Sequence, residues 1–545
     1  LTWRELLGVA LLGIVLAVAM HWPLALHMGR DVAQDLGDPL VQAWQIAWDG
    51  HALAHQPAEL FQANTFWPLP DSLAFSDALV GYAPLGLIGT GPHAAIARYD
   101  ALFLLAYALC FAGAWLLARE LGTSRAGAAV AGLAFAYAPW RLEQEGHMHV
   151  ISSGGIPLAL FLLVRGYRRG APGTILAGWL VATWQFSLGF TLGLMVAYLL
   201  AAGTLAAAVM WWRRGRPPLP RRVLVATAAG MLCLAVVAVV LARPYLRVLD
   251  DHPEAHRTIE DVAGFSGPPY EFLVAARSSR VWADATAPLR DNLGAIPEMT
   301  LFPGLAIIVL ALAGWRRGAM ARRLRRGLAI GVLVFAVLSL GVSLNGASWL
   351  YPYRWLYELL PGWQGIRVPG RLHTLTTLCL ALLAAAGAQA LAARARARWG
   401  ARAAAAVVAL ACLAILAEGW GIAEHPTVPL APAGQREAPQ PALHLPADAF
   451  DNRRYVLWST DGFPDIVNGR GSFMPRQFEA LLRATRGFPD ARSVAYLRRR
   501  GVRSVTVHLA RTPRDSPLRR ASTRSLRGLD LERTRHGTVV LFVLR

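Results

Sequence analysis

The chain has 545 residues, of which 55% are hydrophobic and only 16% are charged. A soluble protein of this length needs a larger charged surface, so the composition excludes an ordinary soluble protein. The formal net charge of +20 could indicate nucleic-acid binding. However, the arginines cluster in short loops between apolar runs, which is the pattern that orients membrane proteins. The cysteines lie inside apolar runs and lack the spacing of a metal site or a disulfide framework; they are Cys110, Cys233, Cys379 and Cys412.

Apolar runs near the roughly 20-residue length that crosses a bilayer recur along the chain. We count 11 of them, near residues 5–22, 97–118, 126–140, 150–166, 173–187, 188–210, 222–242, 301–315, 327–344, 372–393 and 402–423. The first is predicted to be a retained anchor, because no small-residue cleavage site follows its apolar core. The predicted fold class is therefore a polytopic α-helical membrane protein with about 11 transmembrane helices.

The arginine-rich loops predict the orientation of these helices. With the segments above, the basic loops all fall on one side together with Arg4. The positive-inside rule makes that side, and the N-terminus, cytoplasmic. Four long segments then lie on the outer face: residues 23–96, 243–300, 345–371 and the C-terminal part.

The composition changes after residue 423, where the transmembrane domain of residues 1–423 is predicted to end. Residues 424–445 read as a Pro-rich linker, and residues 446–545 as a small extracytoplasmic α/β domain. In it, "RRYVLW", "SVTVHL" and "VVLFVLR" are typical of strands. "MPRQFEALLRAT" and "DARSVAYLRRRG" are typical of helices, the second with an acidic cap and a stop at Gly501.

The stretch "DLGDPLVQAWQIAW", residues 35–48, places carboxylates directly after an apolar run. Asp38 and Pro39 predict a helix start, with Asp as the cap and Pro in the first turn. Trp44 and Trp48 recur on one face, which predicts an amphipathic helix in the outer interface. Asp38 is thus either a helix cap or a carboxylate that acts as general base or metal ligand, and both roles can hold together.

Several motifs together resemble the GT-C superfamily of membrane glycosyltransferases, and in particular poorly characterised bacterial members. They are the first span followed by a long outer loop with "GDP", "LFQANTFWPLPDSLAFSD" (60–77), "RLEQEGHMHVISSGGIPLAL" (141–160), "PYRWLYELLPGWQGIRVPGRLH" (352–373), and the tail segments "NGRGSFMPRQFEALL" and "FPDARSVAYLRRRGVRSVTVH". The resemblance implies a polyprenyl-phosphate sugar donor, an extracytoplasmic acceptor and a bacterial inner-membrane location. It also implies a catalytic base in the first outer loop, for which Asp38 is the first candidate and Asp35 the weaker one.

The segment "EQEGHMH" gathers four ionisable residues at the outer end of the third span: Glu143, Glu145, His147 and His149. One interpretation is that the histidines bind the donor phosphate. A second is that the four hold a divalent cation, Mg²⁺ or Mn²⁺, with Asp38. A third is a solvated loop at the membrane edge. Because the second outer loop has no clear acidic pair, metal dependence stays open.

Arg367 and Arg371 precede another span, at the height of a lipid phosphate, for which Arg is a suitable donor. Arg371 is the preferred ligand; the alternative is that both are interface anchors. Tyr353, with Trp44 and Trp48, is a candidate for stacking on a sugar, although such aromatics also form interface belts.

The resulting hypothesis is a GT-C hexosyl- or pentosyltransferase that transfers its sugar with inversion to a glycan, lipid or protein. The alternatives are a non-catalytic lipid-handling or assembly protein of cell-envelope polysaccharide, or a flippase or transporter. The expected partners are the bilayer, the lipid-linked donor and the acceptor, and no nucleic acid.

Overall fold

The computed structural model describes residues 2–318, 320–342, 350–422 and 424–545. The first residues of the predicted outer loop 345–371, and residues 343 and 344 of the predicted span before it, lie outside the described residues. The chain forms two compact units. Unit 1 comprises Leu1–Ala25, Leu102–Val240 and Arg257–Glu424, and unit 2 comprises Leu26–Ala101, Leu241–His256 and His425–Arg545.

The protein is a multi-pass membrane protein. Within the described ranges, 7 segments are long and apolar enough to cross a membrane: α1 (Trp3–Met20), α4 (Gly91–Glu120), Met148–Arg169, α9 (Phe190–Arg213), α10 (Arg221–Asp251), Pro369–Trp399 and α18 (Ala401–Glu418). Four further predicted spans form shorter or arginine-bearing helices: α5 (Arg125–Ala136), α8 (Pro172–Ser187), α14 (Leu305–Arg317) and α15 (Arg322–Ser339). The count of 11 therefore stays a prediction.

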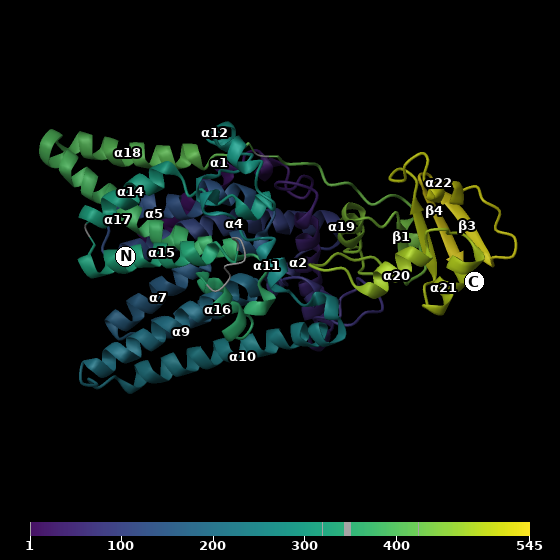
Figure 1. Cartoon of the computed structure of the whole chain (residues 1–545), viewed down its shortest axis with the longest axis horizontal. Helices are drawn as coiled ribbons and strands as arrows, with labels where there is room; N and C mark the ends of the chain where they lie inside the picture. Colours follow the sequence, from purple (N-terminus) through teal and green to yellow (C-terminus); the bar gives the residue numbers. More distant parts are fainter. Residues whose placement is uncertain (1, 319, 343–349, 423) are drawn as a thin grey trace. The chain divides into compact units, whose positions relative to one another are not determined.

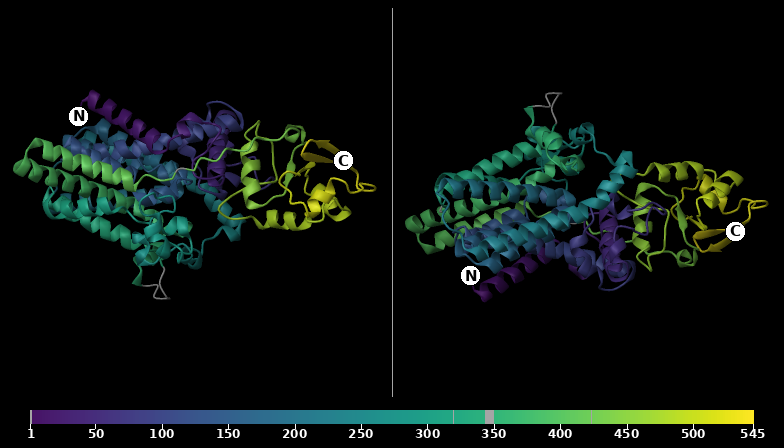
Figure 2. Two further views of the ribbon diagram at one scale, coloured as in Figure 1. Left: turned by 90° about the horizontal axis from the view of Figure 1, so that it is seen from above. Right: turned by 90° about the horizontal axis from the view of Figure 1, so that it is seen from below.

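Unit 1 is a bundle of long helices that run side by side (Figures 1 and 2). Its centre is α17 (His373–Trp399), which packs against α5, α14, α15 and α18. Glycines allow the closest of these contacts, because a Cβ on Gly314 would lie 1.9 Å from the carbonyl oxygen of Leu383. By contrast, α1 buries only Val9, Gly13 and Ala17 and lies at the outside of the bundle (Figure 2).

The span Met148–Arg169 consists of α6 (Met148–Ile151) and α7 (Gly155–Arg169). Short elements connect the other helices of unit 1: α11 (Ile259–Ala263), α12 (Ala283–Arg290), α13 (Ile296–Met299) and α16 (Pro352–Leu359), with 3₁₀ turns at Pro139–Gln144, Pro269–Leu273 and Pro369–Leu372. The buried Glu418, at the end of α18, has a structural role in the same bundle. Its carboxylate accepts from the backbone N–H groups of Leu305 and Ala306, at 3.1 and 3.0 Å, and so satisfies the N-terminus of α14.

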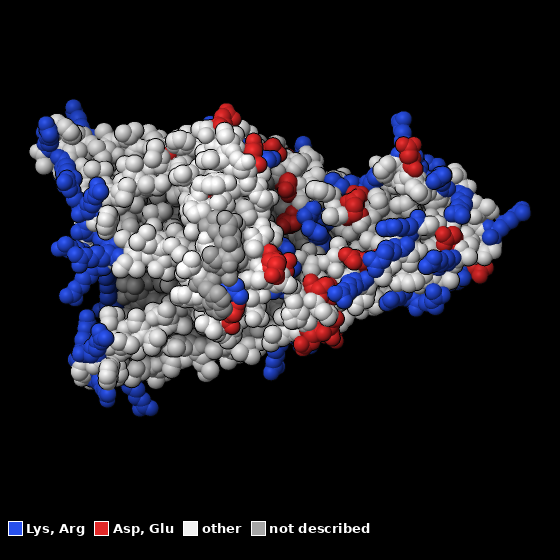
Figure 3. Space-filling view, in the orientation of Figure 1, with Lys and Arg blue, Asp and Glu red and all other residues white. Residues whose placement is uncertain are grey.

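Arginines gather at one end of the bundle in unit 1, where its helices are joined by short loops (Figure 3). The loop between α9 and α10 carries "RGRPPLP", and α15 begins with "RRLRR". By the positive-inside rule, an excess of arginine in the short loops on one side of the membrane marks the cytoplasmic side. The assignment of that end to the cytoplasm stays a prediction.

Unit 2 contains a four-stranded sheet in the order β1-β2-β4-β3. The strands are β1 (Ala442–Leu445), β2 (Ser504–His508), β3 (Leu531–His536) and β4 (Val539–Leu544), of which β1 and β2 are parallel and the other pairs antiparallel. Its helices are α2 (Asp38–His55), α3 (Ala83–Gly86), α19 (Ala449–Trp458), α20 (Arg476–Ala484), α21 (Ala491–Arg499) and α22 (Pro517–Ala521). A small C-terminal α/β region is thereby confirmed.

Most of the elements predicted for this region form as expected, and one does not. The segments "SVTVHL" and "VVLFVLR" are β2 and β4, and α21 is capped by Asp490 and followed by Gly501 at φ +80°. The strand predicted at "RRYVLW" is wrong, because these residues belong to α19. The Asp448 side chain accepts from the N–H groups of Phe450 and Asp451, and this cap starts a helix despite the aromatic content of the segment.

Helix α2 begins at Asp38 as predicted, but two details of that prediction are wrong. The N-cap is Gly37, with no side-chain cap bond, and Asp38 is the first helical residue. The helix also presents no exposed amphipathic face over residues 39–50, which are all buried. Close packing explains the burial: a Cβ on Gly50 would lie 2.1 Å from the backbone of Gly86 in α3.

Candidate active site

Asp38 in unit 2 is held by arginines of the C-terminal region. Its Oδ1 lies 3.1 Å from an Nη of Arg453, and the Asp38 side chain stays 42% exposed. Arg470 is close enough to Asp38 for the carboxylate to influence its charge; burial and Arg453 lower the pKa of Arg470, and Asp38 opposes this. The N-terminus of the 18-residue helix α2 adds a positive dipole end beside the same carboxylate. Asp38 is therefore an oriented, accessible carboxylate.

The other predicted residues of unit 2 have structural contacts. Asp35 closes a tight turn by accepting from the backbone N–H of Gly37 at 2.7 Å. Trp44 and Trp48 are 2% and 3% exposed, and their indole N–H groups donate to Asn64 Oδ1 and the Leu60 carbonyl. Burial leaves neither indole a free face for a sugar in this structure.

Arg371 in unit 1 stands at the centre of a buried polar cluster just before α17. One of its Nη atoms lies 2.7 Å from Glu298 Oε1, and the other lies 2.8 Å from His149 Nε2. Because a guanidinium can only donate, His149 Nε2 must accept, which places the proton of a neutral imidazole on Nδ1. Burial raises the pKa of Glu298, but the neighbouring positive charge, above all that of Arg371, lowers it to about 2. Glu298 is therefore ionised.

Gln144 links His147 to this cluster. Its side-chain amide donates to the carbonyl of Pro297 at 2.7 Å, and its carbonyl oxygen lies 3.0 Å from His147 Nδ1. The rings of His147 and His149 are 5.8 Å apart. The structure thus brings His147, His149 and Arg371 together, as the sequence predicted for a phosphate site, and adds Glu298 and Gln144.

Arg367 extends the positive charge of the cluster. Its guanidinium lies 5.0 Å from the ring centre of Phe265, in a half-buried position. Burial, together with the nearby charges of Arg257 and Arg371, lowers the pKa of Arg367 to about 10. Burial also lowers the pKa of Arg257 itself. Two further arginines and the carboxylates of Glu298 and Asp261 therefore lie within electrostatic range of Arg367, and the surplus of positive charge favours an anion as ligand.

Two local features position the cluster. A Cβ on Gly370 would lie 2.5 Å from the carbonyl oxygen of Glu298, so only glycine allows the chain before Arg371 to approach α13 this closely. The second feature is Arg141, which is 1% exposed. It donates to the Ile151 carbonyl at 2.8 Å and to Ser153 Oγ at 3.1 Å, and so fastens the segment that carries His149.

The four residues proposed as metal ligands point to different partners. Glu143 accepts from the backbone N–H of Arg277 at 2.8 Å, and Glu145 lies 3.4 Å from His21 Nε2. His147 and His149 belong to the Arg371 cluster. Nowhere in the described ranges do three His, Cys, Asp or Glu side chains converge as a ligand set. The donor set expected from "EQEGHMH" therefore does not fit a divalent cation in this structure.

Tyr353, the third candidate for sugar stacking, is fully buried and donates to the Ile366 carbonyl at 3.0 Å.

The sequence did not reveal every charged residue that lies near the candidate site residues in the structure. Four such residues lie in different segments of the sequence, and only the folded structure shows which candidate residues they approach. They are Glu298, Arg257, Arg453 and Arg470. The one available signal was the placement of Glu298 and Arg453 beside apolar runs.

No family model matches the sequence, and no curated protein matches it. A solved structure of the arabinofuranosyltransferase AftD from mycobacteria matches all of this chain and 42% of its own chain, at 16% identity and a TM-score of 0.58. The chain has the GT-C fold. It spans less than half the length of AftD, so the likeness concerns the fold and not the activity of that longer protein.

Two further solved structures match with TM-scores below 0.5. The oligosaccharyltransferase AglB from Archaeoglobus fulgidus, in complex with an inhibitory peptide and a dolichol-phosphate, covers 93% of this chain and 70% of its own, at 14% identity and a TM-score of 0.46. ArnT from Cupriavidus metallidurans, bound to undecaprenyl phosphate, covers 99% of this chain and 98% of its own, at 14% identity and a TM-score of 0.40.

Proposed function

We propose that this protein is a bacterial inner-membrane glycosyltransferase that transfers a sugar from a polyprenyl-phosphate donor to an extracytoplasmic acceptor. The observation that carries the proposal is the convergence of Arg257, Arg367 and Arg371 at the start of α17. Glu298 and Asp261 offset part of this charge, and the two histidines lie beside Glu298. A phosphate group at the membrane boundary is the ligand whose charge and acceptor oxygens suit such a cluster.

Arg371 is the first proposed phosphate ligand, and Arg367 the second. Glu298 holds Arg371 in place at 2.7 Å without being a ligand itself, since it carries the same sign of charge as a phosphate. His149 accepts from Arg371 through Nε2, so it holds the guanidinium beside the proposed phosphate position. His147 adds a second imidazole beside it. When the donor's bond to the sugar breaks, these groups stabilise the negative charge that develops on the lipid phosphate.

Asp38 is the proposed general base. Its carboxylate takes the proton of the acceptor hydroxyl while that oxygen attacks the anomeric carbon of the sugar. The bond from the anomeric carbon to the phosphate oxygen breaks, and the phosphate leaves with the electron pair. A single displacement with one base and no covalent intermediate inverts the anomeric configuration. Arg453 fixes the rotamer of Asp38, and its role is positioning rather than chemistry.

The phosphate site can be tested by binding alone. Full-length protein in nanodiscs is titrated with a polyprenyl phosphate, beside the variants Arg371→Gln and Arg367→Gln. Arg398→Gln is the matched control, because it removes the same charge from the other end of α17. We expect each site variant to bind about tenfold more weakly or worse, as the loss of a charge-assisted hydrogen bond implies, and the control to bind normally. Equal binding by all variants would remove the phosphate site from the proposal.

A further inference from the structure

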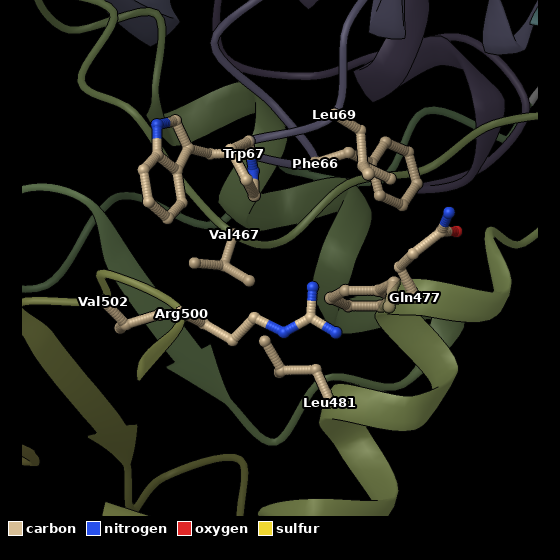
Figure 4. Close-up of a pocket in the computed structure, with 10 residues that line it drawn as sticks. Phe66, Trp67, Leu69, Val467, Gln477, Leu481, Arg500 and Val502 are labelled. Carbon is tan, nitrogen blue, oxygen red and sulfur yellow. The ribbon is translucent and has the colours of Figure 1, made fainter. Parts of the chain in front are cut away.

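A small pocket in unit 2 does not have Asp38 among its lining residues and has no place in the mechanism above. It has a volume of about 30 Å³, and Phe66, Trp67, Leu69, Val467, Gln477 and Arg500 are among the residues that line it. Figure 4 shows Arg500 reaching into the space between Val467 and Leu481, with Trp67 on the opposite side. The pocket thus combines aromatic walls, one cation and one amide.

Two chain segments far apart in sequence build this pocket as a fixed structure. The backbone N–H groups of Phe66 and Trp67 donate to the carbonyls of Asn468 and Ile466, at 3.0 and 3.1 Å. The indole of Trp67 rests on Gly501, where a Cβ would come within 2.9 Å of the ring. Because Gly501 follows Arg500 directly, this contact also fixes where the arginine leaves the backbone.

Arg500 is available to a ligand. Its guanidinium lies 5.5 Å from the ring centre of Tyr496, and it pairs with no carboxylate among the residues that the structure describes. Gln477 is exposed at the rim. These groups suit a sugar that carries a carboxylate. The aromatic ring covers the apolar face of the sugar, and the guanidinium and the amide bind the carboxylate oxygens.

We propose that this pocket is a subsite for a uronic-acid residue of the acceptor, which makes the acceptor an acidic glycan. This inference rests on the proposed function, since it names the class of acceptor for the proposed transfer reaction. The sugar ring lies against Trp67, and its carboxylate pairs with the guanidinium of Arg500. The pocket's volume of about 30 Å³ leaves room for the two oxygens of a carboxylate.

The charge of the surrounding region fits the same partner. Residues 425–545 contain 21 arginines and 10 acidic residues, a net charge of +11. In Figure 3 arginines cover much of the surface over the C-terminal strands and helices. Such a field raises the local concentration of an anionic polymer and speeds its encounter with the subsite.

The test measures binding without any sugar donor, so it does not depend on turnover. Full-length protein in nanodiscs is titrated with oligogalacturonate and with its methyl ester, which has the same rings and no charge. The variants are Arg500→Gln, Trp67→Phe and the control Arg527→Gln, an exposed arginine elsewhere in the same region. Melting temperatures establish that each variant is folded.

We expect the acid to bind and the ester to bind about tenfold more weakly or not at all. Arg500→Gln should lose about tenfold for the acid, Trp67→Phe less, and Arg527→Gln no more than about twofold. The inference is overturned if the folded wild-type protein does not bind the acid, if acid and ester bind alike, or if the control loses as much as Arg500→Gln. Asp38→Asn should bind the acid normally, which separates this inference from the proposed catalysis.

Discussion

Replacing Arg371 by glutamine should reverse the pH dependence of stability that Glu298 contributes. In the wild-type protein the two side chains are 2.7 Å apart and only 12% and 9% exposed. Burial alone raises the pKa of Glu298, and Arg371 is the largest of the influences that lower it again. Without the guanidinium, burial prevails, and the pKa of Glu298 should lie above its ordinary value.

The magnitude follows from the pKa of Glu298. Its fall from 4.5 to about 2 corresponds to roughly 3 kcal/mol in the free energy of unfolding. This stability is fully present above the unfolded pKa and is lost as the pH falls through the folded pKa. In Arg371→Gln a buried carboxylate has lost its partner, which typically costs about 3–5 kcal/mol near neutral pH. That cost should shrink as the pH falls toward 4, where Glu298 becomes protonated.

The assay is thermal unfolding followed by tryptophan fluorescence between pH 4 and pH 8. The control is the double variant Arg371→Gln/Glu298→Gln, in which no carboxylate remains to be buried. His147 and His149 are present in both variants. The melting temperature of the single variant should fall relative to the double variant as the pH rises. Parallel curves for the two variants would refute the reasoning.

Two further predictions concern residues near this cluster. Burial raises the pKa of Glu271 to about 9, so its contribution is full below pH about 4.5 and is lost as the pH rises toward 9. Glu271→Gln should therefore melt higher than the wild type at pH 8 and lose part of the wild-type decline between pH 5 and pH 8; an unchanged decline would contradict this. Gly370→Ala should weaken polyprenyl-phosphate binding about tenfold, because its Cβ would meet the Glu298 carbonyl at 2.5 Å and displace Arg371. Gly203→Ala, where no atom lies within 4 Å, is the control and should bind normally; equal losses in both would show that Gly370 has no special role.

The sequence predicted those elements in which local signals agree with the final packing. The start of α2 at Asp38 and Pro39, the strands β2 and β4, and the helix α21 between Asp490 and Gly501 all have strong local patterns. The segment of α19 failed because its aromatic and β-branched residues suggested a strand, while the Asp448 cap and the packing of Tyr455 favoured a helix.

The site was predictable only in part, and for a physical reason. Arg371, Arg367 and the two histidines were found because they stand at the ends of apolar segments, where a lipid phosphate would lie. Glu298 was missed, since its role depends on contact with a residue 73 positions away. Trp44 was misjudged because a helix that begins at a membrane segment can be buried on all sides by loops that no sequence period reveals.

The central claim is tested most directly by turnover. Purified protein is incubated with a panel of polyprenyl-phosphate hexoses and pentoses and an acidic oligosaccharide acceptor, beside Asp38→Asn. Asp35→Asn is the matched control, since it removes the same charge three residues away from an exposed turn. The account predicts transfer from one donor with inverted configuration, lost in Asp38→Asn and retained in Asp35→Asn. Transfer by a folded Asp38→Asn protein at the wild-type rate would contradict it.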